Sequence, residues 1–100
     1  MDLTVTDAPE SQRYEAHAEE RLAGFMEYQV AGKLFVITHT EVVPEFEGHG
    51  VGGALVRTAL DALRADGRYV LPLCPFAKAW IGRHPDYADL IYDKREQLNQ

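Results

Sequence analysis

Four of the eight glycines in this chain of 100 residues lie between positions 48 and 53, within the stretch EGHGVGGAL. The preceding segment, Leu34–Val42, is rich in β-branched residues and is the strongest predicted strand. The following segment predicts a helix, because apolar residues recur at helical spacing, at Val51, Leu55, Ala59 and Leu63. The first N–H groups of a helix are unpaired and attract anions, and glycine lets a phosphate approach them closely. The junction therefore predicts an anion-binding loop; the alternative is a connector whose glycines serve only a tight turn and close packing.

Upstream of this junction, the sequence predicts antiparallel strands. Residues 1–11 are polar and are expected to form a loose lead-in. Gln12–Ala18 alternates weakly between apolar and polar residues, which favours an edge strand. Arg21–Val30 alternates more clearly, and a tight turn at residues 31–32 joins it to the Leu34–Val42 strand. Strands joined by so short a turn are antiparallel neighbours.

Downstream of the junction, the sequence predicts one more strand and a second helix. The first helix should stop at Gly67, which suits a left-handed C-cap. Tyr69–Leu73 is short and apolar, and a helical crossover allows it to lie parallel to the strand before the glycines. Pro75 suits the first turn of a helix that has Cys74 at its N-cap and ends near His84. This order of elements predicts an α/β fold, with a mixed, mainly antiparallel sheet and helices packed on it.

The composition restricts the class of protein. With 46% hydrophobic residues, residues 1–100 should form one domain with a core over about 13–92. No apolar run has membrane-spanning length and no signal-peptide pattern is present, so we expect a soluble, cytoplasmic protein. The single cysteine, Cys74, cannot form an internal disulfide, which fits a reducing compartment. A net charge of −6 argues against broad nucleic-acid binding, and nothing in the sequence predicts the oligomeric state.

Two nucleotide-binding motifs fail on their context. The run GHGVGG at residues 48–53 matches the dinucleotide pattern GxGxxG, which requires an acidic residue at the end of the next strand. That strand ends instead in Leu73-Cys74-Pro75, and the hairpin before the glycines is antiparallel where a parallel unit should begin. The phosphate loop of nucleotide hydrolases needs a lysine followed by serine or threonine, which the stretch lacks.

The stretch HTEVVPEFEGHGVGGALVRTAL resembles the acyl-CoA pyrophosphate motif of the GNAT acetyltransferases, Q/R-x-x-G-x-G/A, with its two glycines at Gly50 and Gly52. The resemblance continues in CPFAKAWIGRHPDY and spans roughly residues 13–92, and it is greatest to the small, minimal GNAT-like proteins. It implies that the strand before the loop carries a bulge and splays from the next parallel strand. The pantetheine arm of acetyl-CoA would then lie in the gap between the two strands.

The resemblance implies an acetyl-CoA-dependent N-acetyltransferase that transfers acetyl to an amine. Lys78 could neutralise a CoA phosphate, and the other residues expected at the donor are Val42, Val43, Gly48, His49, Gly50, Val51, Gly52 and Gly53. Neither a membrane nor a nucleic-acid partner is expected. No metal is expected either, because the aspartates show no metal-ligand spacing. The alternatives are a non-catalytic module that binds or senses acyl-CoA, and an adaptor whose glycines serve packing alone.

The chain departs from the family pattern at two places. Glu47 stands where glutamine or arginine is usual, so a carboxylate should point away from the pyrophosphate. The family's Asn, Ala and general-acid Tyr correspond to Cys74, Ala77 and Ile81, so the usual tyrosine is missing. The role of that tyrosine is therefore either lost or taken by another residue.

Three side chains are candidates for the chemistry. His39 and Glu41 are two apart on one strand and so share a face, where either could take a proton from the amine or form a polar surface pair. At the N-cap of a helix, Cys74 faces unpaired N–H groups that favour a thiolate. It could act as a nucleophile or as an acid toward CoA, or be a small buried hydrophobe.

Overall fold

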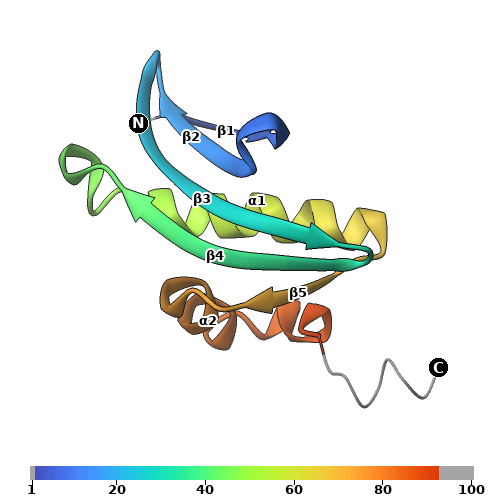
Figure 1. The fold of residues 1–100 in the computed structure, drawn as a ribbon. Helices are drawn as coiled ribbons and strands as arrows, with labels where there is room; N and C mark the ends of the chain where they lie inside the picture. The colour runs from blue at the N-terminus through green and yellow to red at the C-terminus, as the bar shows by residue number, and fades with distance from the viewer. Residues whose placement is uncertain (1, 93–100) are drawn as a thin grey trace, which may run out of the picture.

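The computed structural model describes residues 2–92, and within them five strands form one mixed sheet (Figure 1). The strands lie in the order β1-β2-β3-β4-β5. Neighbours from β1 to β4 are antiparallel, whereas β4 and β5 are parallel. The strand bounds are Leu3–Ala8 (β1), Arg13–Ala18 (β2), Arg21–Ala31 (β3), Leu34–Val42 (β4) and Tyr69–Pro72 (β5). The expected mixed, mainly antiparallel α/β fold is thereby confirmed.

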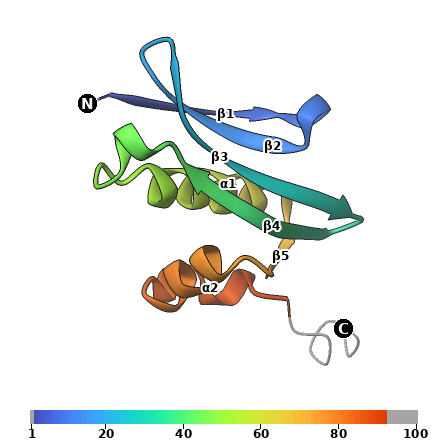
Figure 2. The ribbon, with the colours of Figure 1, turned by 60° about the vertical axis from the view of Figure 1, so that its left-hand side comes forward.

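Two α-helices and three short 3-10 helices complete the fold. The long helix α1, Val51–Asp66, connects β4 to β5 and packs against one face of the sheet (Figures 1 and 2). The second helix α2, Pro75–Gly82, follows β5 and lies beside α1. The 3-10 helices are Pro9–Ser11 (η1), Pro44–Phe46 (η2) and Pro85–Leu90 (η3). After η3, Ile91 pairs with Val70 and covers the outer edge of β5.

The N-terminal segment differs from the sequence-based expectation. Residues 3–8 form a strand rather than part of a loose lead-in, and β1 pairs with β2 along its whole length. The segment expected as an edge strand, β2, is therefore internal, and β1 lies at the sheet edge. Leu3 and Val5 are partly buried against the core. Two apolar residues on one face, in a short segment rich in threonine, form too short a pattern to stand out before their packing is known.

The turns and caps follow the sequence with small shifts. The β3–β4 turn lies at Gly32-Lys33, one residue later than expected, with Gly32 at φ 60°. Gly67 caps α1 in the left-handed conformation, with φ 68°, as its position predicts. The second helix ends at Gly82, two residues before His84.

Among the residues that the structure describes, helices cover one face of the sheet and leave the other open. On β2, the side chains of Tyr14, Ala16 and Ala18 are buried toward α1, whereas Arg13, Glu15 and His17 project from the other side. The core is built on the α1 side, and its largest fully buried side chains are Met26, Ile37, Leu55, Leu60, Val51, Val56 and Val70. We call the α1 side the covered face and the opposite side the uncovered face.

A buried tyrosine ties β1 to the rest of the sheet. The Tyr28 hydroxyl donates a hydrogen bond to Asp7 Oδ1 at 2.6 Å, and its ring stacks on Phe35 at 4.5 Å. Burial and this hydrogen bond raise the pKa of Tyr28 well above its usual value. The neutral tyrosine is therefore the form that the folded chain favours.

We expect Tyr28→Phe to lower the free energy of unfolding by about 1.5 kcal/mol, because it removes a hydrogen bond to a charged group. Tyr14→Phe is the matched control, since Tyr14 is equally buried and its hydroxyl makes no side-chain hydrogen bond within residues 2–92. Denaturant unfolding at neutral pH measures both. The folded-state pKa lies above the unfolded value, so this contribution is complete below about pH 10 and is lost as the pH rises further. Equal losses in the two variants would contradict the assignment.

Candidate active site

The two parallel strands separate halfway along β4. Their pairing ends at Ile37 and Pro72, and the N–H groups of Leu73 and Cys74 both donate to the Ile37 carbonyl, at 3.0 and 3.1 Å. Residues 38–42 continue beside β3 but have no partner on the β5 side within the described residues 2–92. We call the opening between this half of β4 and the chain from Leu73 onward the fork. It exposes a strand edge whose backbone groups can pair with a ligand.

A β-bulge lies where the fork opens. Along β3, Glu27 pairs with His39 and Tyr28 pairs with Ile37, so Thr38 is the extra residue on β4. Its hydroxyl donates to the Glu27 carbonyl at 3.2 Å and holds the bulge against β3. The bulged strand that splays from its parallel neighbour, as the family resemblance implied, is therefore present.

The start of α1 lies at the end of this open strand edge. The first helical hydrogen bond runs from the Ala54 N–H to the Gly50 carbonyl at 3.0 Å, so the N–H groups of residues 51–53 precede it and have no helical partner. No side chain caps this end, and no acidic residue occupies the first turn. A helix start with these properties favours an anion.

The four glycines of the junction have two different functions. Gly48 and Gly50 adopt positive φ, 83° and 75°, and a Cβ on either would meet nothing within 4 Å. A Cβ on Gly52 would lie 2.5 Å from Phe76 Cζ, and one on Gly53 would lie 3.0 Å from Trp80 Nε1. The first pair shapes the turn, whereas the second pair lets α2 pack against α1. Turn shaping and helix packing both belong to the connector interpretation, and the binding of an anion by this loop stays a prediction.

A fifth glycine, on β3, brings the helix start close to the sheet. A Cβ on Gly24 would lie 2.7 Å from the Glu41 carbonyl oxygen and 2.9 Å from Val51 Cγ1. Gly24 thus lets the first turn of α1 pack against β3 and β4. This role was missed from the sequence, because the close approach involves segments far apart in the chain.

Cys74 lies at the inner end of the fork. It is the N-cap of α2, as predicted, and is only 5% exposed. Its thiol donates a hydrogen bond to the Thr40 hydroxyl, with Sγ and Oγ1 3.4 Å apart. Burial alone would raise the pKa of Cys74, but the Thr40 hydroxyl and the nearby N–H groups of Ala77 and Phe76 outweigh it and lower this pKa. The Cys74 side chain makes no hydrogen bond that caps α2.

His39 and Glu41 lie together but not beside Cys74. His39 Nε2 and Glu41 Oε1 are 3.3 Å apart, and both side chains are more than half exposed. The residue between them, Thr40, is the one that contacts Cys74. Since side chains alternate along a strand, His39 and Glu41 project from the opposite side of β4. Phe25 packs beside His39 with ring centroids 6.1 Å apart, and Arg13 covers the Phe25 ring at 4.5 Å.

The remaining predicted donor residues surround the fork and the helix start. Val42 and Val43 are partly buried against the core, and the Val43 N–H already donates to the Ala23 carbonyl at 2.8 Å. His49 and Glu47 are exposed in the loop, and Lys78 is exposed on α2. The role of these residues at the donor stays a prediction.

Arg57, the other cation on these two helices near the fork, is already engaged. Its guanidinium donates to the Tyr87 hydroxyl at 3.2 Å and lies over the Trp80 ring at 5.2 Å. Tyr87 in turn donates to Asp61 at 2.8 Å. These contacts hold η3 and α2 against α1, and so they stabilise the packing of α2 on Gly52 and Gly53.

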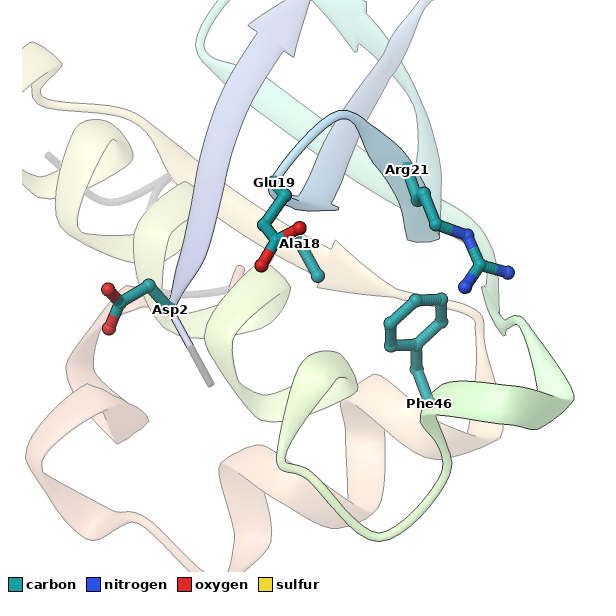
Figure 3. A pocket seen from close by; sticks show the side chains of 5 residues that line it. All are labelled: Asp2, Ala18, Glu19, Arg21 and Phe46. Atoms are coloured by element: carbon teal, nitrogen blue, oxygen red, sulfur yellow. The ribbon is translucent and has the colours of Figure 1, made fainter.

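A separate pocket of about 360 Å³ lies beside η2 and the β2–β3 turn (Figure 3). Arg21 reaches over the Phe46 ring at 5.3 Å and is held by the Glu45 carboxylate at 2.6 Å. The other lining residues are Asp2, Ala18 and Glu19, so two carboxylates disfavour a phosphate there. None of the predicted catalytic or donor residues lines this pocket.

The described residues form neither a metal-binding cluster nor a membrane-spanning helix. Across residues 2–92, no group of three or more His, Cys, Asp or Glu side chains is arranged to hold a metal ion. The expectation of a metal-free reaction stays a prediction. In the same part of the chain, no helix has the length and apolar character that crossing a membrane requires.

Solved structures share this arrangement of strands and helices. A GCN5-like candidate N-acetyltransferase from Staphylococcus aureus is 23% identical, with TM-score 0.71 over 90% of this chain and 88% of that chain. The Escherichia coli ribosomal-protein-S18-alanine N-acetyltransferase is 21% identical, with TM-score 0.58 over 60% of this chain and 39% of that chain. PaiA N-acetyltransferase from Thermoplasma acidophilum, solved with coenzyme A, is 21% identical, with TM-score 0.52 over 56% of this chain and 35% of that chain.

The fold and the fork define an α/β domain of the acetyltransferase type. The family model described as GCN5-related N-acetyl-transferase matches residues 13–90. The chain therefore belongs to the GCN5-related N-acetyltransferase family, as its resemblance in the loop and in the segment after it predicted. A search of proteins with curated functions found no match.

We expect Gly52→Ala to lower the free energy of unfolding by about 1 kcal/mol, because the new methyl group must displace the Phe76 ring. In a Phe76→Ala background, the same substitution should become neutral or stabilising, since alanine favours a helix by about 1 kcal/mol over glycine. Denaturant unfolding of the two single variants and the double variant measures this coupling. Equal effects of Gly52→Ala in the two backgrounds would show that Gly52 has no packing role.

Proposed function

We propose that this protein transfers an acetyl group from acetyl-CoA to an amine. The observation that carries the proposal is the fork, an unpaired half-strand that ends at an uncapped helix start. An extended amide-bearing chain can pair with the open edge of residues 38–42, as an added strand would. A pyrophosphate at the end of that chain can then accept hydrogen bonds from the N–H groups of residues 51–53.

The residues around the fork suit the pyrophosphate and the pantetheine arm of acetyl-CoA. Gly48 and Gly50 leave open space before the helix start, where a pyrophosphate has room. Lys78 supplies an exposed cation, whereas Glu47 is exposed and can point away. Val42 and Val43 present apolar surface that suits the pantetheine arm. The coenzyme A bound in the Thermoplasma acidophilum protein supports the same donor for this chain.

The uncovered face supports a cationic acceptor. His39 and Glu41 project there from β4, and Glu27 is the cross-strand partner of His39. Glu15 lies on the same face, but its carboxylate is paired with Arg13, with Arg13 Nε and Glu15 Oε2 2.7 Å apart. Glu27 and Glu41 therefore supply most of the free negative charge of the uncovered face. An alkylammonium group is attracted to such a face and can lose its proton to Glu41 or His39, directly or through water. The acceptor class that follows is an amine that is protonated at neutral pH.

The transfer can follow either of two routes. In a direct transfer, the amine nitrogen attacks the thioester carbonyl, the C–N bond forms and the C–S bond breaks. The CoA sulfur leaves with the electron pair and takes the Cys74 thiol proton. The nitrogen loses one proton to Glu41 or His39 before it attacks, and a second one through water to the Cys74 thiolate as the amide forms, which restores the thiol. In a two-step transfer, the Cys74 thiolate attacks the thioester carbonyl, and the bond to the CoA sulfur breaks to release CoA thiolate, which takes a proton from water. The amine gives one proton to Glu41 or His39 and attacks the cysteine thioester, the bond to the Cys74 sulfur breaks to restore the thiolate, and the nitrogen loses its second proton to water.

The position of Cys74 bears on these routes. It lies on the opposite side of β4 from His39 and Glu41 and is almost buried. In a direct transfer the amine adds to one face of the planar carbonyl and the sulfur departs from the tetrahedral intermediate, so the base and Cys74 can act from different sides of β4. A two-step transfer requires the acetyl carbonyl to lie first beside Cys74 and then within reach of the amine on the other side of β4.

To test the donor site, Gly50→Ala is compared with Gly67→Ala. Both glycines have positive φ and open space for a Cβ, so both substitutions should cost about 1–2 kcal/mol of stability. Only Gly50→Ala places a methyl group before the helix start, and it should weaken CoA binding at least tenfold, about 1.4 kcal/mol. Calorimetric titration with CoA measures the difference. Equal affinities in the two variants would remove the pyrophosphate from this loop.

To test the reaction, release of CoA thiol from acetyl-CoA is measured with a panel of amines. Wild-type protein should release thiol only when an amine is present, and Glu41→Gln should lower the turnover by about two orders of magnitude with CoA affinity unchanged. Cys74→Ala should fold, bind CoA and lose most of its turnover. If acetyl-CoA is added without amine and mass spectrometry finds one acetyl group on Cys74, the transfer follows the two-step route. CoA binding with no turnover on any amine would favour a binding module instead.

A further inference from the structure

We infer that Thr40 is a positioning residue for Cys74, aiming its sulfur into the fork and supporting both protonation states of the thiol. The inference rests on the proposed function, in which Cys74 acts on the acetyl group or on the departing CoA sulfur. It adds a residue that the sequence comparison does not assign. Thr40 lies within the open half of β4, three residues beyond the last pairing with β5.

The backbone holds Thr40 in a fixed place. It pairs across the sheet with Met26, which is fully buried, and the Thr38 bulge fastens the strand just before it. A β-branched side chain has few allowed rotamers, so its hydroxyl has little freedom to turn away. The hydroxyl is therefore held on the side of β4 from which Cys74 approaches.

The contact joins the two arms of the fork. The Cys74 thiol donates a hydrogen bond from Sγ to Thr40 Oγ1 at 3.4 Å. Within residues 2–92, no other side-chain hydrogen bond joins β4 to α2 or to the N-cap residue of α2. Beyond Ile37, no backbone pairing of β4 with β5 fixes this distance. Cys74 as a residue is 5% exposed, so a polar partner decides how its thiol is oriented in an apolar surrounding.

A hydroxyl is suited to a sulfur that gains and loses a proton. It accepts a hydrogen bond from the thiol, as it does here, and by rotating its O–H bond it donates one to the thiolate. Hydrogen bonds to a charged group are stronger than those between neutral groups, so the hydroxyl favours the thiolate over the thiol. The lowered pKa of Cys74 agrees with this, with burial acting in the opposite direction.

Thr40→Val tests this, since it keeps the shape and removes the hydroxyl. Cys74 is the only cysteine in the chain, so the ultraviolet absorbance of the thiolate, with Cys74→Ala subtracted as a reference, follows its titration alone. Thr40→Val should move the titration to higher pH, and Thr40→Ser should restore it. Thr6→Val is the matched control on the far edge strand β1 and should titrate as the wild type does. If Thr40→Val does not fold, Thr40→Ala against Thr40→Ser makes the same comparison.

Turnover supplies the second measurement. Thr40→Val should lower kcat about tenfold, the effect of losing one hydrogen bond to a charged group, with CoA affinity unchanged. A nucleophile acts as thiolate and an acid acts as thiol, and in either role a raised pKa moves the Cys74 limb of the pH–rate profile to higher pH. The inference is overturned if the Cys74 thiol of Thr40→Val titrates at the same pH as in the wild type. It is also overturned if a folded Thr40→Ser variant does not restore the wild-type titration. Full activity of Cys74→Ala would instead refute the proposed role of Cys74, while the titration still decides the role of Thr40.

Discussion

The separation of β4 from β5 is the feature on which the rest of the site depends. The Ile37 carbonyl accepts hydrogen bonds from two successive N–H groups, those of Leu73 and Cys74, and so ends the parallel pairing while turning the chain away. The Thr38 bulge turns the other strand at the same level. Without this double deviation, residues 38–42 would be an ordinary internal strand. Their backbone groups would then pair with β5 and be closed to a ligand.

The two helices keep the fork at a constant width. Phe76 and Trp80 pack directly over Gly52 and Gly53, so the start of α2 is fixed against the start of α1. The Arg57, Tyr87 and Asp61 contacts fasten η3 behind them. The start of α1, where we propose that the pyrophosphate binds, and the cysteine at the end of the fork therefore belong to one packed unit. A change in helix packing is expected to reach both.

The β4 strand also separates two chemical environments. Thr40 faces the covered side and contacts a nearly buried sulfur, whereas His39 and Glu41 face solvent on the uncovered side. Alternation along a single strand is enough to produce this division. Under the proposed function, the acceptor amine approaches from the solvent side and the CoA sulfur departs on the covered side. An acid and a base can then act without exchanging protons with each other.

The sequence by itself determined the strand before the glycines, the helix after them, the caps at Gly67 and Cys74, and the family, because each depends on residues close together in the chain. It also identified His39 and Glu41 as neighbours on one strand face. Only the tertiary structure decided that residues 3–8 form the edge strand, since that depends on Leu3 and Val5 reaching a core built from distant segments. The same holds for Gly24 beneath Val51, Gly52 beneath Phe76 and Thr40 beside Cys74. Each of these contacts joins elements separated by tens of residues, and local propensity contains no information about which distant side chain a residue will meet.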